Sequence, residues 1–279
     1  MEAVSAVKMR KSQERAFISR PYVHTALRIL SRISGSEAAR QHPLAVQRNV
    51  GKTLLVLVTS DKGLAGSVNS AVLKRAEDVV ASGIEISVIA IGRKAVEFAG
   101  REKLAVLAEY TNVSDDVSLT DVQEMAEVAL KAFATSEQFK NVEIIYQNFL
   151  STFEQEATKR QILPLDPAEI HYTMRGIRPR TGQRSEDVVA PEAVIDYKVE
   201  PNAEAVLDTL IPQLVQIMVF HALLESKASE HSARMVAMKN ATDKSKEVTK
   251  ALTLVYNKER QAAITAEVAE ITGGMEAMK

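Results

Sequence analysis

Cysteine and tryptophan are both absent from the 279-residue chain, and aromatic residues make up only 5% of it. The lack of cysteine excludes disulfides, thiolate metal ligands and cysteine nucleophiles, and it is typical of proteins in a reducing compartment. A large globular core usually holds more aromatic side chains than this. The shortage therefore favours elongated helices that meet along narrow contacts.

A strong charge of either sign is also lacking. The chain has 35 basic and 36 acidic residues, a net charge of −1, and no nucleic-acid partner is expected from that balance. Hydrophobic residues are 46% and charged residues 25% of the chain, a normal soluble proportion. No run approaches the roughly 18 consecutive apolar residues that suggest a membrane span, and no signal peptide or Arg-rich presequence is visible at the start.

Glycine is missing from long stretches at both ends of the chain. No glycine lies between Glu204 and Ile271, where Pro212 is the single proline. A continuous helix over this segment would be roughly 100 Å long, longer than a compact domain of this size is wide. We expect one long helix there, with Gly273-Gly274 as its stop signal.

A second helix is expected over residues 1–34, which are rich in helix formers and precede Gly35. Pro21 should kink this helix or mark a boundary in it, because proline removes a backbone donor. A stripe with three- and four-residue spacing on the long helix needs a partner, and the N-terminal helix is the available one. The stripe consists of Leu207, Leu210, Leu214, Ile217, His221, Leu224, Ala228, His231, Met235 and Met238, followed by Val248, Leu252, Val255, Ala262, Ala266 and Ala269.

The middle of the chain alternates between short apolar runs and amphipathic segments, which predicts parallel βαβ units in a doubly wound sheet. The stretch 166–192, rich in Pro, Arg, Asp, Gln and Gly, predicts an exposed loop. We expect strands at 53–59, 84–91, 104–110 and 142–149, further strands at 161–165 and 194–199, and helices at 69–82, 93–101 and 119–135.

The expected fold class is α/β. A Rossmann-like, mostly parallel sheet domain is flanked by N- and C-terminal helices that form a long antiparallel coiled coil. The expected divisions are an N-terminal coiled-coil helix at 1–50, the α/β domain at 51–203 and a C-terminal coiled-coil helix at 204–279. Since the first helix is too short to cover the second, some of the C-terminal helix must meet another protein.

The sequence contains little evidence for a catalytic, cofactor-binding or metal site. The turn SDKGLAGS at 60–67 follows a strand and opens a helix, where phosphates bind in α/β folds, but it matches neither GxGxxG nor a P-loop. Gly63 and Gly66 are better explained by a tight turn. Asp61 is the best-placed carboxylate, without an evident partner. His221 and His231 lie ten residues apart with no further ligands, so we interpret them as coiled-coil seam residues.

Two stretches of the long helix are candidate interfaces. ARMVAMKNATD (233–243) interleaves basic residues with methionine and small residues, which make adaptable contacts. It is either a solvated coiled-coil face or a partner surface. YNKERQAAITAEVAEI (256–271) mixes polar and small side chains all round the helix, which favours a tight sleeve that does not lock onto it.

Three separated blocks carry a family resemblance. They are MEAVSAVKMRKSQERAFISRPY (1–22), TSDKGLAGSVN (59–69), and ESKASEHSARMVAMKNATDKS (225–245) with LVYNKERQAAITAEVAEITGG (254–274). In the same order, they resemble the N-terminal helix, the first strand–turn–helix and the C-terminal helix of the gamma subunit of F-type ATP synthases. The likeness covers most of the chain and is weakest across about 110–195.

The resemblance implies a non-catalytic rotor shaft that binds no cofactor. Its coiled coil would lie in a bore formed by alpha and beta subunits, and its α/β domain, with the epsilon subunit, would rest on the membrane ring of c subunits. Proton flow would turn the ring and the shaft, which would force the beta sites through different nucleotide affinities. By motif match, Arg260, Gln261 and Thr265 would contact the beta subunits near the top of the bore. Met1, Glu2 and Lys8 would face the head.

The sequence departs from the family at two points. The family usually has a further helical stretch before the position of Met1, so we expect either a start upstream of it or a truncated chain. The cysteine-bearing insertion of the chloroplast type is absent, so thiol control is not expected. Because no transit sequence is visible, the resemblance implies a bacterial protein attached peripherally to the cytoplasmic face of the cell membrane.

Two other functions stay open at this point. The Gly63–Gly66 turn suits a nucleotide-binding α/β protein whose coiled coil makes it dimeric. The long helices also suit a coiled-coil scaffold unrelated to energy conversion.

Overall fold

The computed structural model describes residues 1–33, 37–165, 200 and 202–278. The chain divides into two compact units, Met1–Met235 and Val236–Lys279, hereafter unit 1 and unit 2. The loop expected at 166–192 and the strand expected at 194–199 lie outside the described residues. The domain limits 1–50, 51–203 and 204–279 remain predictions.

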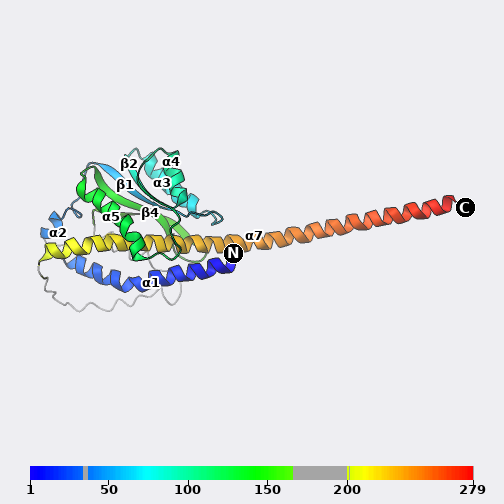
Figure 1. The fold of residues 1–279 in the computed structure, drawn as a ribbon, viewed down its shortest axis with the longest axis horizontal. Coiled ribbons are helices and arrows are strands. Elements are labelled where there is room, and N and C mark those ends of the chain that lie inside the picture. The colour runs from blue at the N-terminus through cyan, green and yellow to red at the C-terminus, as the bar shows by residue number, and fades with distance from the viewer. Residues whose placement is uncertain (34–36, 166–199, 201, 279) are drawn as a thin grey trace. The chain divides into compact units, whose positions relative to one another are not determined.

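Unit 1 is built on a five-stranded sheet with the order β3-β2-β1-β4-β5 (Figure 1). Its first four strands are parallel, and β5 pairs antiparallel with β4, so the expected mostly parallel sheet is confirmed. The last strand begins earlier than the one expected at 161–165, because a short turn after β4 reverses the chain directly. The strands are β1 (Lys52–Val58), β2 (Ile86–Ile91), β3 (Ala105–Tyr110), β4 (Phe139–Phe149) and β5 (Gln155–Leu163).

Helices cover both faces of the sheet. One core cluster joins α3 and α4 to β1 and β2, and the other joins α1, α5 and α7 to the opposite face. Six of the seven residues of β1 are buried, since a central parallel strand is covered on both sides. The described helices are α1 (Glu2–Ile33), α2 (Glu37–Gln41), α3 (Val68–Ala81), α4 (Arg93–Arg101), α5 (Leu119–Thr135) and α7 (Ala203–Ala277).

The two long helices run antiparallel within unit 1 (Figure 1). Near the start of α7, Asp208 Oδ1 lies 3.1 Å from Nε2 of His42, the residue that follows α2. Residues from the first turns of α1 and residues 227–234 of α7 line one pocket at the other end. Ala26 and Ile33 of α1 share a core cluster with α7. The expected pairing of the two chain ends is therefore confirmed.

Two expected helix breaks are absent. Helix α1 continues through Pro21, and α7 continues through Gly273 and Gly274 to Ala277. A proline inside a helix removes one backbone hydrogen bond, which a long helix tolerates when its other bonds and its packing remain. Glycine permits the left-handed conformation that ends a helix but does not impose it. The boundary considered at Pro21 and the stop expected at Gly273-Gly274 were thus wrong, and the alternative of a kink at Pro21 stays a prediction.

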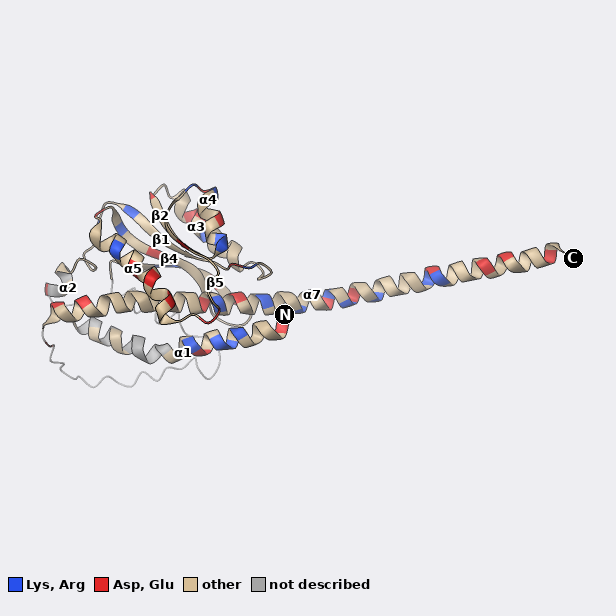
Figure 2. Ribbon diagram, viewed as in Figure 1, with Lys and Arg blue, Asp and Glu red and all other residues tan. Residues whose placement is uncertain are grey.

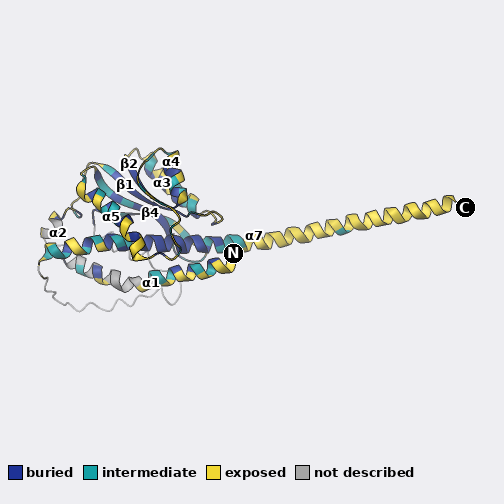
Figure 3. Cartoon of the chain, in the orientation of Figure 1, coloured by how far each residue is buried: buried dark blue, intermediate teal, exposed yellow. Residues whose placement is uncertain are grey.

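Helix α7 is buried far more completely than a coiled-coil seam requires. Every residue from Val219 to Ser232 is buried, on all sides of the helix (Figure 3). A two-helix contact would bury one stripe, but here the sheet, α1 and α5 belong to the same core as α7. The predicted seam was correct for His221, Leu224 and Ala228 but described only part of the buried surface.

An 18-residue window of α7 is long and apolar enough to cross a membrane, with a mean hydropathy of 1.5. That window is 61% buried within the protein, and a core helix passes the same test.

Gly92 joins β2 to α4 and lies against Thr59 at the end of β1, so it provides a test of how closely these two strands pack. Its φ is +93°, and a Cβ placed there would lie 2.2 Å from the carbonyl oxygen of Thr59. We expect Gly92→Ala to destabilise unit 1 by roughly 3 kcal/mol, because it combines backbone strain with an overlap that the strand cannot relieve.

Gly100 is the matched control, since it lies in α4 and a Cβ added there would meet nothing within 4 Å. Gly100→Ala should leave stability unchanged or raise it by up to about 1 kcal/mol. Urea unfolding followed by far-UV circular dichroism measures both. Equal midpoints for the two variants would contradict the packing described at Gly92.

Candidate functional site

Three connections at one end of the sheet surround α7 before it leaves unit 1. They are the β1–α3 turn (60–67), the β3–α5 connection (111–118) and the β4–β5 turn (150–154), and we call them the collar. All follow the carboxyl ends of parallel strands, where doubly wound folds place their ligands. In this protein the collar contacts a helix of the same chain.

Side chains of α7 donate hydrogen bonds to backbone carbonyls of the collar and of β4. Lys227 Nζ donates to Val113 O at 2.9 Å, Ser232 Oγ to Thr152 O at 2.6 Å and Arg234 to Gly63 O at 3.2 Å. Ser229 Oγ donates to Gln147 O at 3.3 Å. Carbonyls beyond strand ends have no ladder partner, so the polar residues of α7 supply donors to backbone groups outside the sheet, such as Val113 O and Gly63 O.

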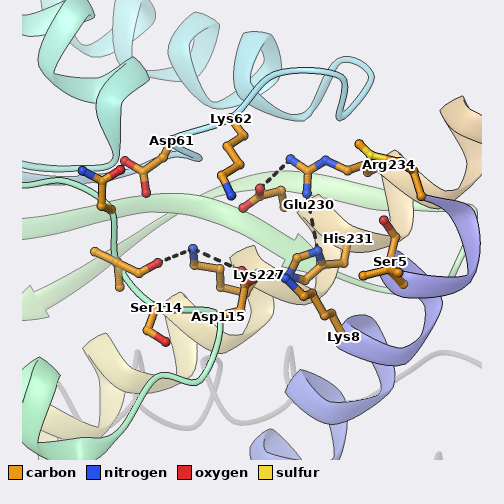
Figure 4. Close-up of a pocket in the computed structure, with 14 residues that line it drawn as sticks. Ser5, Lys8, Asp61, Lys62, Ser114, Asp115, Lys227, Glu230, His231 and Arg234 are labelled. Carbon is orange, nitrogen blue, oxygen red and sulfur yellow. Dashed lines mark hydrogen bonds and ion pairs between the residues drawn. The ribbon is translucent and has the colours of Figure 1, made fainter.

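Asp115 is the central acceptor of the collar (Figure 4). Its Oδ2 accepts a hydrogen bond from Lys8 Nζ of α1 at 2.6 Å. Its Oδ1 lies 3.0 Å from His231 Nε2 and 3.7 Å from Lys227 Nζ, both on α7. Burial raises the pKa of Asp115, but the Lys8 hydrogen bond and the charges of His231, Lys227 and Lys8 outweigh it and lower the pKa to about 2. Asp115 is therefore ionised at neutral pH.

His231 extends this network along α7. Because the Asp115 carboxylate can only accept, the proton lies on Nε2 of His231, which leaves Nδ1 as an acceptor. Arg234 is 3.4 Å from that Nδ1 and also pairs with Glu230 at 2.6 Å. Burial, together with the charge of Arg234, lowers the pKa of His231 more than Asp115 and Glu230 raise it. The imidazole is thus neutral near pH 7.

The N-terminal half of α1 is attached to the collar by its basic residues (Figure 2). Besides Lys8, Lys11 pairs with Asp116 at 3.0 Å. Arg15 pairs with Asp116 and donates to Val117 O. Ser5, Met9 and Ser12 form the buried side of this segment. The polar contacts therefore supplement a seam of mostly small side chains.

A second polar cluster holds α7 deeper in unit 1. Arg160 of β5 lies over the ring of Tyr146 of β4 at 5.9 Å, and both side chains are buried, as is Glu225 of α7. Burial and then the charge of Glu225 raise the pKa of Tyr146 well above its usual value, so this phenol stays neutral. Charged groups of both signs are thus present in the core beside the apolar contacts.

A pocket of about 430 Å³ opens beside the collar (Figure 4). It lies beyond the carboxyl ends of the parallel strands, where doubly wound folds bind nucleotides. In this chain two residues of the 60–67 turn have structural contacts instead. Asp61 accepts from the backbone N–H of Arg93 and so holds the start of α4. Gly66 has φ +58°, and a Cβ there would lie 3.9 Å from Ala233 of α7. Both features give residues of the 60–67 turn a structural function that requires no bound nucleotide.

The six residues expected to contact other subunits fall in different units. Met1, Glu2 and Lys8 lie in unit 1, where Met1 and Lys8 line the pocket and Lys8 binds Asp115. Arg260, Gln261 and Thr265 lie in unit 2 and are exposed, with Thr265 Oγ1 donating to Gln261 O.

Sequence reasoning missed Asp115, Lys227 and Arg234 as a network and assigned His231 to the seam. The adjacent aspartates of VSDDVS after a predicted strand were the available signal. In the described part of the chain, no group of three or more His, Cys, Asp or Glu side chains could hold a metal ion.

Comparison with known proteins decides the family. A family model described as "ATP synthase" matches residues 1–278. The ATP synthase gamma chain of Roseiflexus castenholzii is 37% identical, with 100% of this chain and 91% of the relative aligned. That of Heliobacterium modesticaldum is 34% identical, with 100% and 92% aligned. The chain belongs to the ATP synthase gamma-chain family. It is the gamma subunit of an ATP synthase.

Solved structures agree on the fold of this gamma chain. A chain of the Tetrahymena thermophila mitochondrial ATP synthase, from a structure of the central stalk and c-ring, has a TM-score of 0.60 at 23% identity, with 87% of this chain and 97% of that chain covered. A chain of the Euglena gracilis mitochondrial enzyme has a TM-score of 0.59 at 18% identity, with 99% and 94% covered.

The neutral His231 makes the stability of the gamma chain depend on pH. Its pKa in the folded chain lies below the unfolded value of 6.5, so the unfolded state takes up a proton more readily as the pH falls. We expect wild-type stability to decrease between pH 7.5 and 5.5, and His231→Gln to show a smaller decrease. Urea unfolding across that range measures the slopes, and parallel slopes would contradict a buried neutral imidazole.

Proposed function

We propose that the chain is the shaft that couples proton flow through the membrane sector to ATP synthesis or hydrolysis at the beta subunits, without catalysing a reaction itself. The observation that carries the proposal is the contrast along α7. Residues 219–232 are buried on all sides within unit 1, whereas nearly all of unit 2 is exposed (Figure 3). One part of the helix is fixed to the α/β domain, and the other offers its whole surface to partners.

Unit 2 has the properties of a helix that functions inside a sleeve. A long helix is stable in water mainly when its apolar side chains pack against a partner. In unit 2 such side chains are exposed, so the helix needs a partner outside this chain. Charged residues of both signs are spread along the same surface (Figure 2). We propose that the alpha and beta subunits surround unit 2 in the assembled enzyme. The exposed apolar residues are Val248, Leu252, Leu254, Val255, Tyr256, Ile264, Val268, Ile271, Met275 and Met278.

The remaining partners are assigned to the α/β domain. We propose that the epsilon subunit and the c-subunit ring bind there, and that the complex lies at the cytoplasmic face of a bacterial cell membrane. The gamma-chain relatives are bacterial, which supports this placement. No nucleic acid takes part.

The subunit contacts are proposed for two groups of residues. Arg260, Gln261 and Thr265 contact the beta subunits from unit 2, which their exposure supports. Met1, Glu2 and Lys8 face the head from the start of α1, where Met1 is 71% exposed. Lys8 already donates one hydrogen bond to Asp115 of the same chain, so only its remaining donors are available for contact with the head.

Native purification is the experiment that tests the proposed function. The chain is recovered from membranes under mild conditions and its partners are identified. We expect alpha, beta, epsilon and c subunits in one complex. Recovery of the chain without ATP synthase subunits would overturn the proposal.

The unit 2 contacts can be separated from stability by mutation. Arg260→Ala with Gln261→Ala should lower the rate of ATP synthesis by the reconstituted enzyme on the order of tenfold, as loss of central interface contacts does. The stability of the isolated chain should change by less than about 0.5 kcal/mol, because both side chains are exposed.

Lys250→Ala is the matched control, since Lys250 is exposed on the same unit and is not among the proposed contacts. It should leave the rate near that of the wild type. Equal rates for the control and the double variant would exclude Arg260 and Gln261 as contacts that matter for synthesis.

A further inference from the structure

Two adjacent aspartates in the collar hold the long helices differently. Asp115 pairs with Lys8 on α1 and with His231 and Lys227 on α7. Asp116 pairs with Lys11 and Arg15, which both belong to α1. Asp115 thus links the β3–α5 connection to both α1 and α7, whereas Asp116 links it to α1 alone.

The partners of Asp115 on α7 are enclosed. The side chains of Lys227 and His231 are 10% and 4% exposed, and Lys227 also donates to Val113 O in the same connection. A turn or a slide of α7 in the collar would separate these groups from Asp115 while they stay away from water. Unpaired buried donors are unfavourable, and a buried cation without its partner is more so. The carboxylate therefore opposes motion of α7 against the sheet.

The opposite side of Asp115 fixes α1. The buried residues in the first turns of α1 are small or flexible, namely Ser5, Met9 and Ser12. Such small or flexible side chains allow close approach but interlock little with a neighbouring helix, so they give little resistance to sliding. The Lys8–Asp115 hydrogen bond has a defined length and geometry, so it sets where α1 stops along α7.

We propose that Asp115 is a positioning residue of the rotor, which makes α1, α7 and the α/β domain turn as one body. The proposal rests on the proposed function as a shaft. Torque that enters through the α/β domain passes to α7 at the collar, and Asp115 is the group there that holds both helices at once. Without its charge, α7 slips in the collar under load and part of the rotation is lost before it reaches the beta subunits.

The test compares Asp115→Asn with Asp116→Asn in the assembled ATP synthase, reconstituted into vesicles. ATP hydrolysis and ATP-driven acidification of the vesicles are measured together. Asp115→Asn should lower the acidification per ATP hydrolysed by at least about twofold, since only the hydrogen bonds to the collar carbonyls then hold α7, and none of them reaches α1. Asp116→Asn should keep the wild-type ratio, and Asp115→Glu, which restores the charge, should recover part of it.

The readout distinguishes positioning from stability, because a merely unstable rotor lowers hydrolysis and acidification together. A wild-type ratio for Asp115→Asn, or an equal decrease for both asparagine variants, would overturn the proposal. If Asp115→Asn does not assemble, His231→Leu takes its place, because leucine has no donor for the carboxylate, which itself remains. An unchanged ratio in that variant has the same meaning. Each of these outcomes leaves the proposed function intact, which fails only if the wild-type chain is not found in the complex.

Discussion

The structure of unit 1 depends on the enclosure of α7. Over residues 219–232 the helix has no exposed side, so the sheet, α1, α5 and the collar all take their positions against it. A helix enclosed in this way is usually apolar all round. This one carries Glu225, Lys227 and His231 in the enclosed region, and each of these polar groups needs a partner in a fixed place.

That requirement explains how a gamma chain can hold residues 219–232 of α7 in one position while the rest of the helix is exposed. Apolar contacts contribute most of the stability but do not distinguish well between neighbouring positions of a helix. Hydrogen bonds from Lys227, Ser232 and Arg234 to collar carbonyls do distinguish them, because a small rotation leaves several donors unpaired. Unit 2 has few such constraints within the chain, which agrees with the proposed contacts to the alpha and beta subunits.

Much of the fold could be predicted because its signals are local. The apolar run of β1, the capping residues Ser118 and Asp121 of α5, and the glycine-free segment of α7 each act within a few residues. The three family blocks gave the family, and the comparisons confirmed it. The six expected subunit contacts remain proposals.

The collar could not be predicted, because it depends on contacts between distant residues. Asp115 and His231 are 116 positions apart and meet only once β3, α5 and α7 are packed. The heptad stripe gave one buried face of α7 and could not show that loops cover the rest. The boundary at Pro21 and the stop at Gly273 were wrong for a related reason, since a local preference yields to the packing or length of the whole helix.

The central claim is that α7 consists of a part fixed by its own chain and a part that requires other subunits. Amide hydrogen exchange along α7, in the isolated chain and in the assembled ATP synthase, tests it most directly. The account predicts slow exchange for residues 219–232 in both states. For residues 240–277 it predicts fast exchange in the isolated chain and slow exchange in the complex. Exchange at 240–277 that is equally slow in both states, or fast exchange at 219–232 in the isolated chain, would contradict it.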